Sequence, residues 1–172
     1  MPFDIRSIAV VAVALGGCAW DLRTRRLPNA LTGGAAAAAL LFAVSVDGIS
    51  GLGWSAAGGA TAVALFFPFF ALGGMGAGDV KLLGALGAWL GALDALYLAL
   101  VTSLAGGVIA VGVMLWHRRG RQTLSNLWLL LTFWRTAGLR PVPELTLQNA
   151  RGPKLAYAVP IAVGAIATLW LR

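Results

Sequence analysis

Long apolar runs divide the chain, and they constrain its fold more than any other feature. Six such stretches stand out: Ile5–Trp20, Ala30–Val46, Leu52–Leu72, Asp79–Leu93, Ala95–Trp116 and Leu155–Leu171. A helix needs about 20 apolar residues to cross a bilayer, with a range of about 17–25. The first and fourth runs are short, so we expect their ends to reach only part of the membrane depth. The pattern predicts an all-α membrane protein, a bundle of about six transmembrane helices.

The composition agrees with a single transmembrane domain over residues 1–172. Only 11% of the residues are charged, whereas a soluble domain carries about 25%. The basic residues bracket the apolar runs, so membrane orientation explains the net charge of +7 better than nucleic acid does. Cys18 is the one cysteine, which excludes an internal disulfide and a cysteine-based metal site. We expect no metal and no cofactor.

The N-terminus has two interpretations. Leu15-Gly16-Gly17-Cys18 follows an apolar run and resembles the end of a lipoprotein signal. Against this, Asp4 offsets Arg6 in the region before the run, and cleavage would remove the first helix of a coherent bundle. We therefore predict a first transmembrane helix that is retained.

The distribution of Lys and Arg predicts the orientation. If the N-terminus lies outside, every basic residue except Arg6 and Arg172 falls on the inner side. This bias predicts that both termini are outside and that the inner loops are Asp21–Asn29, Gly73–Gly78 and His117–Lys154. Within the last loop, Leu124–Trp134 is too short to span a membrane. It is either an interfacial helix on the inner leaflet or a helix packed on the bundle.

Two aspartates are placed to meet in this topology. Asp21 closes the first span and Asp79 opens the fourth, both on the inner side, where a charge at a membrane boundary is costly. Asp4, Asp47 and Asp94 fall on the outer side, and the remaining acid is in a proline-flanked loop. Two carboxylates in contact are expected to share one proton near neutral pH. One can then activate water while the other protonates the peptide, which predicts an intramembrane aspartic protease.

Each aspartate also has a structural interpretation. Asp79 could be the N-cap of the fourth helix, and Asp21 could be a solvated residue of a charged loop. The glycines before Asp79 favour the catalytic alternative, because their backbone can unwind or admit an extended peptide. These glycines are Gly73, Gly74, Gly76 and Gly78. The later ones, Gly84, Gly87 and Gly91, are expected to form a surface for close helix packing.

Basic residues near the two aspartates have alternatives too. Lys81 could tune the acidic pair or balance charge at the interface. Arg25 and Arg26 could bind lipid phosphates or fix the orientation of the chain, and orientation is the simpler explanation.

Two segments together resemble the signatures of the prepilin peptidases, membrane aspartic proteases with a Gly-x-Gly-Asp motif. They are Asp21-x-x-x-Arg25-Arg26-Leu27-Pro28-Asn29 and Gly76-x-Gly78-Asp79-x-Lys81, and Gly152-Pro153-Lys154-Leu155-Ala156 extends the likeness. The resemblance implies that Asp21 and Asp79 are catalytic. It implies supporting roles in the site for Gly76, Gly78, Lys81, Arg25, Arg26, Pro28 and Asn29. It also implies a prepilin or pseudopilin substrate, whose short basic leader is cut after a glycine at the cytoplasmic face of the bacterial inner membrane.

The sequence departs from many members of this family in one respect, and this indicates which branch of the family it resembles. Many bacterial members of this family carry a cytoplasmic domain with paired Cys-x-x-Cys motifs, which is linked to N-methylation of the cleaved pilin. With Cys18 alone, this sequence lacks those motifs. It is similar to the short, peptidase-only branch found with Flp-type (tight adherence) pili, so we expect cleavage without methyltransferase activity.

Two other classes of membrane protein compete with a protease. A small channel or assembly scaffold would have ionisable groups strung through the bilayer depth, whereas both aspartates lie at one face. A transporter of anions or lipids would use the inner basic cluster, but no helix centre carries a positive residue. The protease interpretation is therefore favoured.

Overall fold

The described part of the chain is mostly helical and contains no strand. The computed structural model describes residues 4–118, 120–138, 140–142 and 156–171. Its helices are α1 (Ile5–Thr24), α2 (Asn29–Ala71), α3 (Ala77–Leu90), α4 (Ala92–Trp116), α5 (Gly120–Ala137) and α6 (Ala158–Trp170). The prediction of an all-α membrane protein is confirmed. The segment Gly152–Leu155, which extends the family likeness, lies outside the described residues.

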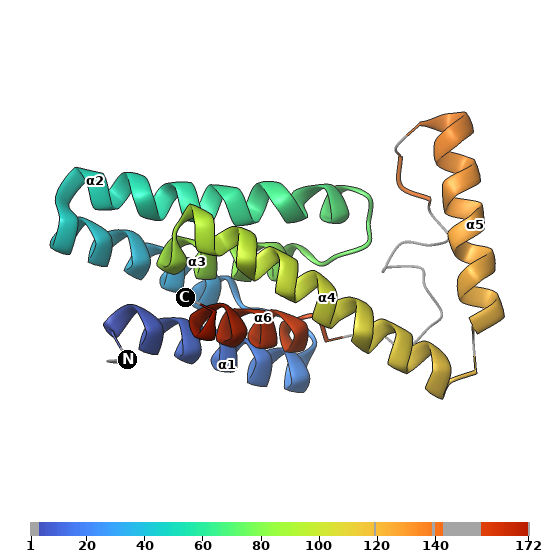
Figure 1. Cartoon of the computed structure of the whole chain (residues 1–172), viewed down its shortest axis with the longest axis horizontal. Coiled ribbons are helices and arrows are strands. Elements are labelled where there is room, and N and C mark those ends of the chain that lie inside the picture. Colours follow the sequence, from blue (N-terminus) through green and yellow to red (C-terminus); the bar gives the residue numbers. More distant parts are fainter. Residues whose placement is uncertain (1–3, 119, 139, 143–155, 172) are drawn as a thin grey trace.

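Helix α2 turns back on itself at Gly48. This residue has φ 63° and ψ −144°, a conformation that costs glycine little because it lacks a Cβ. Figure 1 shows the result, two antiparallel arms joined at the left end of the bundle. We call residues 29–47 the first arm and residues 49–71 the second arm. They correspond to the predicted spans Ala30–Val46 and Leu52–Leu72.

Three helices, α1, α2 and α4, are long and apolar enough to cross a membrane by length and composition. The other two predicted spans correspond to α3, with 14 residues, and α6, with 13. The boundary predicted between the fourth and fifth spans is wrong. The chain turns at Gly91 alone, with φ 83°, so Asp94 lies in the first turn of α4 and not between helices. A side chain at Gly91 would collide with the Trp54 ring, so this sharp turn requires glycine.

The core is centred on α3. All residues of this helix from Leu82 to Leu90 are buried, and Leu82, Leu83 and Leu86 are fully enclosed. Glycines bring the second arm close to α3, since Gly58 faces Gly87 and Gly59 faces Gly84 backbone to backbone. The predicted packing role of Gly84 and Gly87 is thereby confirmed.

Hydrogen bonds fix both arms of α2 to α3. The indole Nε1 of Trp89 donates to the Ala35 carbonyl at 3.0 Å, which holds the first arm. The buried hydroxyl of Ser55 donates to the Ala88 carbonyl at 2.8 Å, which holds the second arm. The two arms and α3 therefore form one group of three packed helices.

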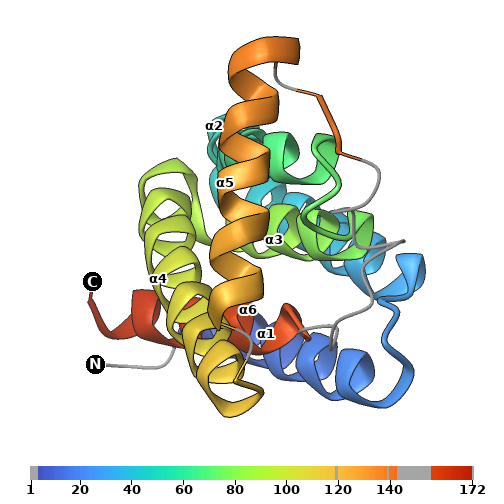
Figure 2. The same cartoon turned by 90° about the vertical axis from the view of Figure 1, so that its right-hand side faces the viewer.

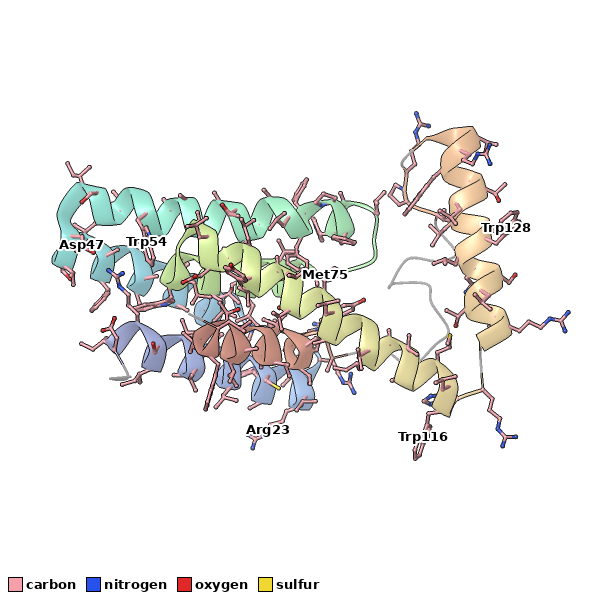
Figure 3. All side chains as sticks on the ribbon, viewed as in Figure 1. Arg23, Asp47, Trp54, Met75, Trp116 and Trp128 are labelled. Atoms are coloured by element: carbon pink, nitrogen blue, oxygen red, sulfur yellow. The ribbon has the colours of Figure 1, made fainter. Side chains whose placement is uncertain are left out.

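Both described ends of the chain lie toward the side of the bundle where α2 turns (Figure 1). There Arg6 forms a salt bridge of 2.8 Å with Asp47, and its guanidinium lies 4.7 Å from the ring centroid of Trp54. Figure 3 labels Asp47 and Trp54 at this end and Arg23 toward the opposite one. That both termini lie outside the membrane stays a prediction.

Helix α5 stands apart from the bundle. Figures 1 and 2 show it crossing the far end of α4, roughly perpendicular to the packed helices. Its apolar side chains are exposed, Trp128 at 74% and Leu124 at 67%. The alternative of a helix packed on the bundle is therefore wrong, because these side chains have no bundle surface to cover them.

Candidate active site

Asp21 lies on the buried face of α1. The buried residues of this helix are Val10, Ala14, Gly17 and Asp21, spaced four, three and four apart, as expected for one face of a helix. Only 8% of Asp21 is exposed. The alternative of a solvated loop residue is wrong, because α1 continues to Thr24 and carries Asp21 into its last turns.

Gly17 allows α1 to approach α3. A methyl carbon placed on Gly17 would lie 3.0 Å from a terminal carbon of Leu82, closer than most Cβ contacts. In the antiparallel pair of helices, Asp21 follows Gly17 by one turn and Asp79 precedes Leu82 by about one turn. Both aspartates are thus displaced toward the same end of the bundle. The charge of Asp21 acts electrostatically on Asp79.

Asp79 is the third residue of α3 rather than its N-cap. The N-cap is Gly76, and the Asp79 carboxylate accepts a hydrogen bond from the Gly76 backbone amide. This is the reciprocal half of a capping box, in which the third residue turns back to the cap. The N-cap alternative considered for Asp79 is therefore wrong by three residues. The hydrogen bond turns its carboxylate back toward the start of the helix.

The glycines of the second motif have separate roles. A methyl carbon on Gly76 would lie 2.9 Å from Oδ2 of Asp79, so glycine leaves room for the carboxylate. A methyl carbon on Gly78 would lie 3.0 Å from the Leu27 Cβ. The absence of a side chain at Gly78 lets the start of α3 pack against the connection between α1 and α2. Gly76 thus affects the acid directly, and Gly78 affects it through the neighbouring loop.

The connection between α1 and α2 carries the basic residues of the first motif. Arg25 has φ 54° and ends α1, and its backbone amide donates to the Asp21 carbonyl at 2.8 Å. Thr24 Oγ1 donates to the Arg26 carbonyl at 2.8 Å, which holds the turn. Both arginine side chains are exposed. Pro28 is the N-cap of α2, where its missing N–H costs no hydrogen bond.

Lys81 and Asn29 bring the two motifs together. The Lys81 Nζ donates to Oδ1 of Asn29 at 2.8 Å, joining the start of α2 to the first turns of α3. Both side chains are exposed. Lys81 and Asn29 were both predicted to support the site, and the structure brings them into direct contact.

Tyr157 lies near the site, although the sequence did not predict it as a site residue. It lies directly before α6, is half-buried against the core, and its phenol is within electrostatic reach of Asp79. The segment that extends the family likeness ends at Ala156, one residue earlier. Nothing in the local sequence indicates that this tyrosine lies near an aspartate 78 residues before it.

The other described acids lie apart from this pair. Asp47 is bound to Arg6, and Asp94 begins α4 at the opposite end of α3 from Asp79. Among the described residues, no three His, Cys, Asp or Glu side chains gather in one place. Asp21 and Asp79 therefore stand as the one candidate acidic pair of this part of the chain.

Fold and site together define a class: a helical membrane protein with two carboxylates from different helices at one end of its bundle. Comparison with protein families matches the type IV leader peptidase family over residues 8–111, which include Asp21 and Asp79. Because this match covers more than half of the 172 residues, the chain belongs to the type IV leader peptidase family. Comparisons with curated proteins and with solved structures give no match.

Proposed function

We propose that this protein is a membrane-embedded aspartic endopeptidase that removes the basic leader of Flp-type prepilins. Membership of the type IV leader peptidase family supports a prepilin leader as substrate. The observation that carries the aspartic mechanism is the Gly17–Leu82 contact, which brings Asp21 and Asp79 to the same end of the α1–α3 pair.

The mechanism uses the pair as acid and base. Two neighbouring carboxylates in an apolar bundle carry one shared proton, because two adjacent negative charges repel. The ionised carboxylate removes a proton from water, which attacks the peptide carbonyl carbon. The protonated carboxyl donates its proton to the carbonyl oxygen, which forms a tetrahedral diol. The carboxyl that took the proton from water then gives it to the leaving nitrogen as the C–N bond breaks, and the other carboxylate takes a proton back from the diol, which restores the shared proton.

The substrate reaches the pair as extended chain. A helical peptide shields its carbonyl groups, so the scissile segment unwinds before cleavage. The turn between α2 and α3 contains Gly73 with φ 77° and ends at Gly76 beside Asp79. Gly73, Gly74 and Gly76 carry no side chains in this turn, which supports close approach of a peptide backbone.

The active site faces the cytoplasm in this proposal, with the protein in the bacterial inner membrane. Arg23, Arg25, Arg26 and Lys81 lie near the end of the bundle that holds the acidic pair. Cytoplasmic loops of membrane proteins carry an excess of Lys and Arg. The same orientation puts α5 on the inner surface, with its exposed leucines and Trp128 in the headgroup region.

Processing of a prepilin tests the proposal. The protein is co-expressed with a Flp-type prepilin in a strain without another prepilin peptidase, and the pilin is examined by gel and mass spectrometry. We expect a smaller pilin whose new N-terminus follows a glycine and carries no added methyl group. An unprocessed prepilin beside the membrane-inserted protein would contradict peptidase activity on this substrate, and a methylated N-terminus would contradict the peptidase-only assignment.

A further inference from the structure

An apolar groove lies on the surface of α2 and α3, next to the acidic pair but separate from it. Its volume is about 440 Å³, and it is lined by both arms of α2 and by one face of α3. Small residues form much of its wall, among them Gly33, Ala36 and Gly84. Asn29 and Lys81 form its polar end. The groove is therefore amphipathic along its length.

The length of the groove matches one leaflet of a membrane. On the first arm it runs from Asn29 to Leu40, about 16 Å at 1.5 Å per residue. The hydrocarbon core of a bilayer is about 30 Å thick, so one leaflet is about 15 Å deep. A transmembrane helix would need a groove about twice as long. These dimensions fit a single acyl chain that enters from the side of Lys81.

The polar end carries an available positive charge. An ammonium group has three donors, and Lys81 uses one of them on the neutral amide of Asn29. The ion pair that the described residues form is Arg6 with Asp47, at the other end of the bundle. The charge of Lys81 is thus not neutralised by a carboxylate in this part of the chain. Basic sites between membrane helices on the cytoplasmic side suit anionic headgroups.

We propose that this groove binds one anionic phospholipid of the leaflet on the Lys81 side. The phosphate contacts the Lys81 ammonium beside Asn29, and one acyl chain lies along Gly33, Ala36 and Gly84 between the two arms. The proposal does not depend on protease activity, since it rests on the shape and charge of the groove alone.

Neighbouring glycines provide a matched pair of variants. Gly33 and Gly34 are both exposed on the first arm, and a Cβ on either would meet nothing within 4 Å. Gly33 lines the groove, whereas Gly34 does not. Gly33→Leu therefore fills the groove without disturbing the core, and Gly34→Leu makes the same chemical change outside it. Ala36→Leu, one turn further along the groove, is a second filling variant.

Native mass spectrometry of the purified full chain, titrated with phosphatidylglycerol or phosphatidylcholine, tests the site. We expect one phosphatidylglycerol retained by the wild type and by Gly34→Leu. Gly33→Leu should retain it about ten-fold less, the loss expected when roughly two methylene groups leave an apolar surface. Lys81→Gln should bind both lipids equally. Circular dichroism checks that each variant keeps its helices.

Three results would overturn the proposal. The first is retention of phosphatidylglycerol by Gly33→Leu and Ala36→Leu at the wild-type level. The second is displacement of the lipid by water-soluble glycerol phosphate, which would indicate a phosphate site without a chain-binding groove. The third is unchanged lipid binding in Gly33→Leu together with a raised KM for prepilin, which would assign the groove to the apolar segment of the substrate.

Discussion

At the scale of single residues, Gly76 controls where the Asp79 carboxylate lies. Its backbone amide donates a hydrogen bond to that carboxylate, and its Cα leaves the space that Oδ2 occupies. A proton-transfer group must lie within hydrogen-bond distance of the atom it serves. The backbone amide of Gly76 and its missing side chain therefore both affect where the Asp79 carboxylate can transfer a proton.

Gly76→Ala should lower the cleavage rate while leaving the fold intact. The added methyl carbon would lie 2.9 Å from Oδ2 of Asp79, so the carboxylate must move. A displacement of about 1 Å at a catalytic group can reduce the rate about 100-fold. Single-turnover cleavage of a prepilin by the purified variant measures the change.

Gly74→Ala is the control in the same turn. A methyl carbon there meets only the Phe69 carbonyl oxygen, at 3.4 Å, an ordinary contact. We expect near wild-type cleavage from this variant. Equal losses in Gly74→Ala and Gly76→Ala would show that the whole turn, rather than the space beside Asp79, sets the rate.

The sequence predicted which residues matter at this scale better than it predicted their positions. Asp21 and Asp79 could be selected because acids are rare in apolar runs. The N-cap of α3 could not be predicted, because Asp79 follows several glycines and each of them is a possible start of the helix. The burial of Asp21 depends on how far α1 continues, and no local signal ends the helix at Trp20 rather than Thr24.

At the scale of helices, the contact between α1 and α3 positions the acidic pair. Gly17, on the buried face of α1, lies directly against Leu82, and Asp21 is one turn further on. Separation of the helices at Gly17 would move Asp21 away from Asp79 without changing either acid. The contact of Gly17 with Leu82, one helical turn from the aspartates, thus determines the distance between the two carboxylates.

Gly17→Val should therefore reduce cleavage, whereas Gly16→Val should not. Overpacking in a tight core costs about 1–3 kcal/mol, and here part of that cost is relieved by moving α1 away from α3. At Gly16 the nearest side-chain atom to an added methyl carbon is a Leu31 carbon at 3.9 Å, so valine fits. The prepilin assay compares the two variants, and a larger loss in Gly16→Val would contradict the assigned contact.

Apolar runs predicted the helices, but the sequence did not predict which glycines form the turns between them. The sequence contains 23 glycines, and nothing local distinguishes Gly48 and Gly91, which reverse the chain, from those inside helices. Their role depends on tertiary neighbours, such as Trp54 against Gly91. The position of α5 was also left open, because its amphipathic pattern suits either a membrane surface or a packed interface.

At the scale of the whole molecule, orientation in the membrane decides which side the acidic pair faces. Arg6 and Asp47 lie at one end of the bundle, and Arg23 lies toward the other (Figure 3). The excess of basic residues around the acidic pair predicts that its end is cytoplasmic.

Cysteine labelling in intact cells measures this orientation. After Cys18→Ser, a single cysteine is introduced either at Ile49, which is 87% exposed beside the α2 turn, or at Arg23. A membrane-impermeant maleimide should label Ile49→Cys from outside and should not label Arg23→Cys until the cells are opened. The reverse pattern would place the acidic pair outside and contradict a cytoplasmic site.

The central claim is that Asp21 and Asp79 act together as a catalytic pair, and Asp94 provides a matched control. Asp94 is the third residue of α4 after the glycine N-cap Gly91, as Asp79 is the third residue of α3 after Gly76. Asparagine keeps the size of each side chain but cannot transfer the proton. A structural role at a helix start would therefore affect Asp79 and Asp94 alike, whereas catalysis would not.

The most direct test measures prepilin cleavage by Asp21→Asn, Asp79→Asn and Asp94→Asn, each purified and checked for helix content. We predict that the first two lose activity by at least about 10²–10⁴-fold, the contribution of general acid–base catalysis, while Asp94→Asn stays within a few-fold of the wild type. Near-normal cleavage by either Asp21→Asn or Asp79→Asn would contradict the catalytic pair.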